Sequence, residues 1–195
     1  MNSINCYLAE IRDVLGGMET RTIEENVAIL YEAWRKGRKV FLVGNGGSAA
    51  TASHMANDLS KATIVPGKPR MKAIALTDNI SLISAWANDD CYESVFRQQL
   101  ENLLERDDVV LAISASGNSP NILRAVEFAR RQGAPTIGWT GKGGGRLTDI
   151  VDLAVHAPTD DVGMIESCHL ILDHLVTREL RRLIETDGTD RKDTA

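Results

Sequence analysis

Apolar residues recur at helical spacing in the first part of the chain. Over residues 3–15 and 22–36 they fall three or four positions apart, which places them on one face of a helix. The positions are Ile4, Leu8, Ile11 and Leu15, then Ile23, Val27, Leu30 and Trp34. Gly16 and Gly17 stand between the two runs. A pair of glycines favours a turn, so we expect one helix to end and the next to begin there. The pattern predicts two amphipathic helices within residues 1–38.

After residue 38 short apolar runs alternate with helical segments. We predict buried strands at residues 39–43, 72–76, 109–113, 135–139 and 151–156. We predict helices at about 48–61, 79–87, 91–105, 119–132 and 164–185. This alternation is typical of an α/β fold, a three-layer doubly wound parallel sheet of five strands. We expect residues 39–185 to form this domain, residues 1–38 to serve oligomerisation, and the polar residues 186–195 to form a disordered tail.

The composition of the chain argues against several classes of function. The chain has 195 residues and a formal net charge of −5, which argues against a nucleic-acid surface. No run approaches the roughly 18 apolar residues of a membrane span, and the N-terminus has no signal-peptide pattern. Three cysteines without a CxxC pair favour a reduced cytoplasmic protein. Any phosphate must therefore be bound locally, by backbone N–H groups and hydroxyls.

A glycine-rich segment, Gly44 to His54, directly follows the predicted strand at 39–43. Its glycines allow a tight turn, and the helix that begins there points backbone N–H groups outward. The segment is not a P-loop, because no Lys-Ser or Lys-Thr follows the glycines. It is either a glycine-rich helix cap or a ligand site, and we favour the ligand site.

A serine-rich segment follows the strand at 109–113. Ser114, Ser116 and Ser119 lie within six residues, and Pro120 suits the first turn of the next helix. A single serine here is an ordinary N-cap. Three hydroxyls with Gly117 at a helix N-terminus are better suited to a phosphate group.

The segments GNGGSA and SxSGNS together resemble the sugar isomerase (SIS) fold, and specifically the phosphoheptose isomerase family. The resemblance runs from the N-terminal helices to about residue 184. It implies that the sugar and its phosphate are bound by Asn45, Gly46, Gly47, Ser48, Asp58, Asn88, Asp89, Ser114, Ala115, Ser116, Ser119 and Glu166. Ala115 stands where the family has Thr, which removes one hydroxyl and predicts a modest loss of affinity.

The family also implies a metal and an acid–base pair. It binds zinc through a His, a Glu four residues later, a Gln, and a His eight residues after the Gln. Those positions here are His54, Asp58, Glu166 and His174. We therefore expect one Zn²⁺ at these four residues, with Asp58 or Glu166 as the catalytic base and His174 as its acid partner.

Helix geometry constrains this metal set. Eight helical residues span roughly 12 Å, so Glu166 and His174 meet only if the helix is irregular or if two subunits contribute. His169 is the fallback ligand, and His156 is expected to be structural.

The resemblance implies a cytoplasmic homotetramer that isomerises sedoheptulose 7-phosphate through a cis-enediol. Two other readings remain open. One is a non-catalytic SIS protein of the replication-initiator-associating type, and the other is a regulatory subunit that binds sugar phosphate without metal.

Overall fold

The computed structural model describes residues 3–188, and within them strands and helices alternate along the chain. The helices are α1 (Ser3–Gly16), α2 (Thr20–Arg35), α3 (Gly46–Lys61), α4 (Ile80–Asp89), the short 3₁₀ turn η1 (Tyr92–Ser94), α5 (Val95–Leu103), α6 (Pro120–Arg131), α7 (Gly145–Ile150) and α8 (Val162–Thr186). The strands are β1 (Lys39–Gly44), β2 (Lys72–Ala75), β3 (Val109–Ile113), β4 (Thr136–Thr140) and β5 (Leu153–His156).

The five strands form one parallel sheet in the order β2-β1-β3-β4-β5. From β1 the chain moves outward to β2 and then crosses back to β3 on the other side of β1. The strand order therefore reverses between β1 and β3, which is where open parallel sheets bind their ligands. The register pairs Gly44 with Ile113, so the loops that follow these two strands begin side by side.

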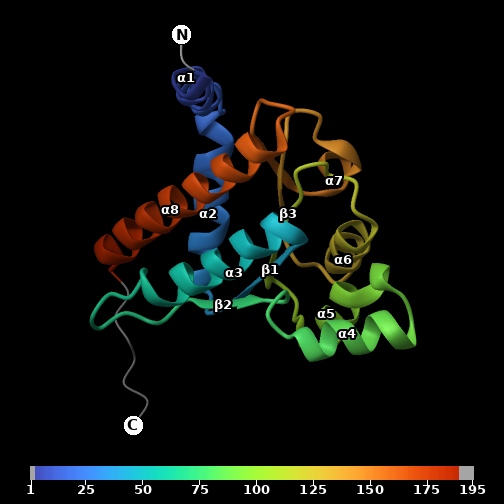
Figure 1. The fold of residues 1–195 in the computed structure, drawn as a ribbon. Helices are drawn as coiled ribbons and strands as arrows, with labels where there is room; N and C mark the ends of the chain where they lie inside the picture. The colour runs from blue at the N-terminus through green and yellow to red at the C-terminus, as the bar shows by residue number, and fades with distance from the viewer. Residues whose placement is uncertain (1–2, 189–195) are drawn as a thin grey trace.

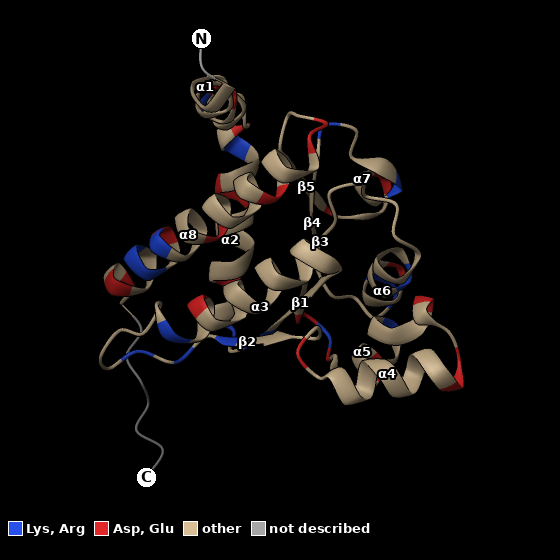
Figure 2. Ribbon diagram, in the orientation of Figure 1, with Lys and Arg blue, Asp and Glu red and all other residues tan. Residues whose placement is uncertain are grey.

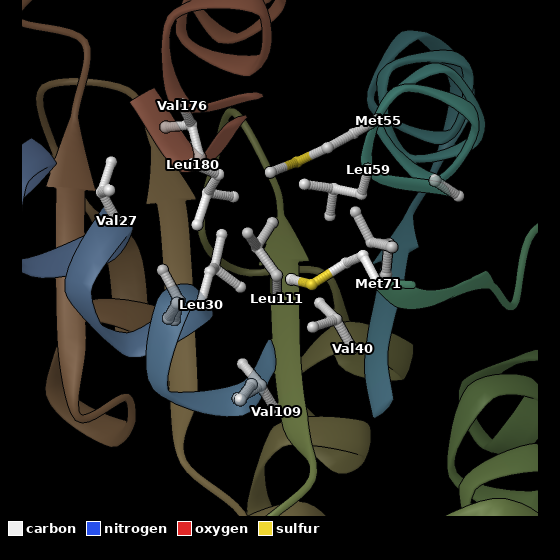
Figure 3. Close-up of a cluster of buried hydrophobic side chains, with 14 of the residues drawn as sticks. Val27, Leu30, Val40, Met55, Leu59, Met71, Val109, Leu111, Val176 and Leu180 are labelled. Carbon is white, nitrogen blue, oxygen red and sulfur yellow. The ribbon is translucent and has the colours of Figure 1, made fainter. Parts of the chain in front are cut away.

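Helices cover both faces of the sheet (Figure 1). On one face α2, α3 and α8 bury Leu30, Leu59 and Leu180 against alternate residues of β1 and β3 (Figure 3). On the other face α5, α6 and α7 bury Phe96, Ile122 and Leu147, among others, against the remaining strand positions. The predicted three-layer, doubly wound α/β fold is confirmed.

Most predicted elements are shifted by one or two residues at their ends, and three differences are of another kind or need comment. The helix α7 was not predicted, because its six residues are too few to show an apolar period. The helix expected at 91–105 is a 3₁₀ turn followed by α5, and it ends at Leu103. The last strand begins at Leu153 rather than at residue 151.

The two N-terminal helices differ in burial. The helix α2 buries Leu30 and Trp34 in the core against the sheet, whereas α1 has no buried residue. Of the predicted tail, residue 186 belongs to α8 and residues 189–195 lie outside the described residues. Across residues 3–188 we find no helix that combines the length and apolar character needed to span a bilayer.

Candidate functional site

The glycine-rich turn lies between β1 and α3. Gly44 is packed so closely on the Ser48 carbonyl that a Cβ there would overlap it, and Gly46 has a φ of +54°. Both positions therefore require glycine. Asn45 is the N-cap of α3, but its side chain makes no capping bond. Gly46 and Gly47 are exposed while Ser48 is buried, so the turn presents backbone rather than the Ser48 side chain to a ligand.

The serine loop, residues 114–119, begins beside this turn at the end of β3. Ser114 is buried and its Oγ accepts a hydrogen bond from the Gly117 N–H at 3.2 Å. Ser116 is exposed, and Ser119 caps α6 by position only, because its hydroxyl makes no capping bond. The hydroxyls of Ser116 and Ser119 therefore lie at the N-terminus of α6, where the helix dipole favours an anion.

Residues at and before α7 form hydrogen bonds with the serine loop. The Gly117 carbonyl accepts from Leu147 N–H at 2.9 Å, and the Asn118 side chain accepts from Arg146 N–H at 3.0 Å. The carbonyl of Ala115 accepts from Gly141 N–H at 3.0 Å, so the backbone group at this Thr-to-Ala position is held as well. The helix missed by sequence analysis therefore fixes the predicted phosphate loop.

Asn88 and Asp89 lie at the exposed end of α4. The Asn88 amide donates to Asp89 at 2.8 Å. Tyr92, just beyond them in η1, donates its hydroxyl proton to Asn45 at 3.0 Å, which joins this corner to the glycine-rich turn.

The helices α3 and α8 pack side by side and run in the same direction. His54 pairs with Asp173, and Ala62 with Arg181, both at a separation of 119 residues. At the start of the two helices Glu166 faces Gly47 with the same offset, and a Cβ at Gly47 would overlap the Glu166 carboxylate. We call this contact between the two helices the α3–α8 seam.

Four ionisable side chains meet in the middle of the seam. Donor atoms of His54, Asp58, Asp173 and His174 all lie within 4.8 Å of one another. Nδ1 of His54 is 2.8 Å from Asp173 Oδ2 and 3.8 Å from Asp58 Oδ2, and Nε2 of His174 is 4.0 Å from Asp58 Oδ2. Two imidazoles and two carboxylates are a donor set suited to Zn²⁺.

Asp173 is not among the predicted site residues. Its side chain is fully buried, and burial raises the pKa of its carboxyl group. The hydrogen bond that His54 donates to Asp173 in turn raises the pKa of His54. The only signal was its place next to His174, which does not identify a partner on α3.

The structure separates Glu166 from the other three predicted ligands. Within one chain its carboxylate lies at the N-terminus of α3, over Gly47, and it is not part of the four-residue cluster. His169 also lies apart, since it is buried and its Nε2 is 3.3 Å from the Thr140 carbonyl. His156 contacts Thr140 at 2.7 Å through Nδ1.

Charged residues are unevenly placed around these features. Figure 2 shows Lys and Arg along the C-terminal half of α8 and on the segment before β2, whereas the start of α3 carries no charge. The glycine-rich turn and the serine loop therefore offer neutral hydrogen-bond donors, and the charged groups of the site lie along the seam.

Comparison with known proteins identifies the family of this chain. A family model described as "SIS domain" matches residues 6–141. The chain is 38% identical to a phosphoheptose isomerase of Akkermansia muciniphila over 83% of this chain and 85% of that protein. It is 41% identical to that of Pelobacter propionicus over 76% of this chain and 78% of that protein.

A solved structure of a phosphoheptose isomerase has a similar fold. A phosphoheptose isomerase from Francisella tularensis superposes with a TM-score of 0.87 at 28% identity, covering 93% of this chain and 97% of that one. The chain therefore belongs to the SIS domain family and, within it, to the phosphoheptose isomerases.

Proposed function

We propose that the protein isomerises a phosphorylated sugar between ketose and aldose, with sedoheptulose 7-phosphate as the favoured substrate. The observation that carries this proposal is the position of Glu166, a carboxylate aimed at the glycine-rich turn of α3. It lies between neutral loops suited to a sugar phosphate and a cluster suited to a metal. The names of the relatives support the heptose as substrate.

The loops bind and orient the substrate. Ser116, Ser119 and the N-terminus of α6 hold the phosphate, with Ser114 shaping the loop from below. The backbone of Gly46 and Gly47, with Asn88 and Asp89, holds the sugar hydroxyls. No cation is required at the phosphate, because hydroxyls, amides and the helix dipole supply the attraction.

Glu166 carries the proton between carbons. It accepts the proton of the hydroxyl-bearing carbon next to the carbonyl and returns it to the former carbonyl carbon. The hydroxyl proton passes to the neighbouring oxygen, so the intermediate between ketose and aldose is a cis-enediolate that carries one proton on its two oxygens. We choose Glu166 rather than Asp58 as the base because Asp58 points toward the two imidazoles.

The seam cluster would hold the metal. His54, Asp58, Asp173 and His174 are the residues whose donor atoms converge, and we therefore assign His174 to the ligand set rather than to an acid role. A bound Zn²⁺ polarises a carbonyl oxygen and stabilises negative charge that develops on it.

We further propose a homotetramer. The helix α1 exposes Tyr7 and Leu8, and α8 exposes Leu170, Ile171 and Leu175. Neither apolar face is covered within the described part of the chain, so a second copy is the expected partner. Light scattering should give about four times the chain mass of 21.3 kDa, and a monomer would contradict the proposal.

A coupled assay across five-, six- and seven-carbon ketose phosphates, with and without added Zn²⁺, tests the reaction. We expect turnover to be fastest with the seven-carbon substrate and to fall when a chelator is present. Absence of turnover with all three would favour a non-catalytic SIS protein.

The two departures from the family pattern offer a sharper comparison. Glu166→Gln should abolish turnover, since an amide cannot accept the proton. The double variant Asp58→Glu with Glu166→Gln restores the family arrangement and should recover part of the rate. If Glu166→Gln alone keeps the wild-type rate, Glu166 is not the base.

A further inference from the structure

A reciprocal pair of amides joins segments that are far apart in the sequence. The Asn45 Nδ2 donates to Asn121 Oδ1 at 2.9 Å, and Asn121 Nδ2 donates back to Asn45 Oδ1 at 2.8 Å. The Tyr92 hydroxyl donates to the same Asn45 oxygen at 3.0 Å. Asn121 is only 2% exposed, so its two bonds are made out of contact with water. We call Asn45, Tyr92 and Asn121 the amide strut.

The strut uses most of the bonding capacity of Asn45. A carboxamide oxygen accepts two hydrogen bonds and its nitrogen donates two. Asn121 and Tyr92 occupy both acceptor positions of Asn45, and Asn121 takes one of its two donors. Asn45 can thus give a sugar at most one N–H from its side chain. Its side chain is better described as a connector than as a ligand for several hydroxyls.

Asn121 is equally committed. Its oxygen accepts from Asn45 and from the Ile122 N–H at 3.0 Å. Replacing Asn121 by an apolar residue would remove both hydrogen bonds that hold the half-buried Asn45 amide in place. The orientation of the Asn45 side chain therefore depends on Asn121.

The three strut residues belong to three parts of the proposed substrate site. Asn45 starts α3 at the glycine-rich turn, and Tyr92 follows the corner that carries Asn88 and Asp89. Asn121 is in the first turn of α6, directly after the serine loop. The strut thus links the proposed sugar-hydroxyl contacts to the proposed phosphate contact.

We propose that Asn121 is a positioning residue that fixes the distance between the phosphate loop and the sugar-hydroxyl turn, and so determines which sugar length is bound best. The inference rests on the proposed function, because it needs a phosphate at one end and hydroxyls at the other. A ligand held at two points fits only if its length matches their separation. A loosened strut lets that separation vary, which weakens binding of the matched sugar and reduces discrimination.

Asn121→Ala tests this inference by calorimetry with three probes: sedoheptulose 7-phosphate, a six-carbon ketose phosphate and inorganic phosphate. We expect the dissociation constant for the seven-carbon ligand to rise at least tenfold and its advantage over the six-carbon ligand to shrink. Affinity for inorganic phosphate should stay within twofold, since the serine loop is braced independently by α7. Tyr92→Phe removes one of three bonds and should give a smaller change of about two- to threefold, because the bond is partly exposed.

Asn118→Ala is the matched comparison, because Asn118 also bridges within this region but lies outside the strut. Its amide holds Ser116 O and Arg146 N, so its loss should weaken inorganic phosphate and sugar phosphate by the same factor. Melting temperatures and circular dichroism confirm that each variant is folded, and Asn121→Asp, which keeps the acceptor oxygen, should be intermediate.

The inference is overturned if Asn121→Ala weakens phosphate and sugar phosphate equally, or if it changes neither. Failure of the proposed function looks different. A wild-type chain that binds sugar phosphate without isomerising it contradicts the isomerase, while the strut effect is still measured by binding. A wild-type chain that binds no sugar phosphate overturns both.

Discussion

The two sides of the site are built in different ways. The serine loop and glycine-rich turn are neutral, and their form is set by backbone geometry at positions such as Gly44 and Gly117. The α3–α8 seam is charged, and its form is set by which residues two helices bring together. The comparison teaches that binding elements can be local in sequence, whereas the groups for metal and proton chemistry are assembled across 119 residues.

The largest effect is expected on the seam. His174→Ala removes one of four converging donors, so it should abolish stoichiometric zinc and lower kcat at least a hundredfold while the fold survives. His156→Ala is the matched control, since His156 contacts Thr140 outside the cluster and should leave metal content unchanged. Mass spectrometry of the metal and steady-state kinetics measure both. Wild-type turnover in His174→Ala would show that the seam is structural.

Acid should destabilise the fold through His169. Burial lowers the pKa of His169 from its ordinary 6.5 to about 4. Between these values the unfolded chain binds the proton and the folded chain does not, so stability falls as pH drops. The loss is about 3 kcal/mol on going from pH 7 to below pH 4. The free energies of unfolding of the wild type and of His169→Gln, measured with urea, should approach each other as the pH falls. Parallel curves would contradict the assignment.

A substitution at one glycine should disrupt the serine loop. Gly117 has a φ of +62°, and a Cβ there would overlap the Gly144 carbonyl. Gly117→Ala should lower the free energy of unfolding by at least about 2 kcal/mol, which corresponds to a fall of roughly 4–8 °C in melting temperature. Gly143→Ala is the control, because nothing lies within 4 Å of its added Cβ. Equal melting temperatures of the two variants would refute the account of the loop.

The smallest effect is expected at one hydroxyl of the serine loop. Ser116 is exposed at the start of α6, and Ser116→Ala removes a donor to a charged phosphate. Affinity for a sugar phosphate should fall about tenfold, with little change in stability. Competition with inorganic phosphate measures this affinity. An unchanged affinity would show that the phosphate is not bound by this loop.

The features predictable from sequence are those whose chemistry is local. Glycines before a helix and serines around Gly117 limit the backbone within a few residues, so both loops could be placed without knowing the fold. Asp173 and Asn121 could not be found this way, because their partners are set by the register of α3 on α8 and by the adjacency of β1 and β3. Helix rise set a condition on the predicted meeting of Glu166 and His174, but it did not predict that Glu166 lies over Gly47.

The most direct test of the account is solvent exchange during isomerisation. The central claim is that Glu166, positioned over Gly47, moves a proton between adjacent carbons of a sugar phosphate. Nuclear magnetic resonance of sedoheptulose 7-phosphate in D₂O with the wild-type protein should show deuterium at the carbon next to the carbonyl. With Glu166→Gln the exchange should fall at least a hundredfold. A Glu166→Gln variant that incorporates deuterium at the wild-type rate would contradict the claim.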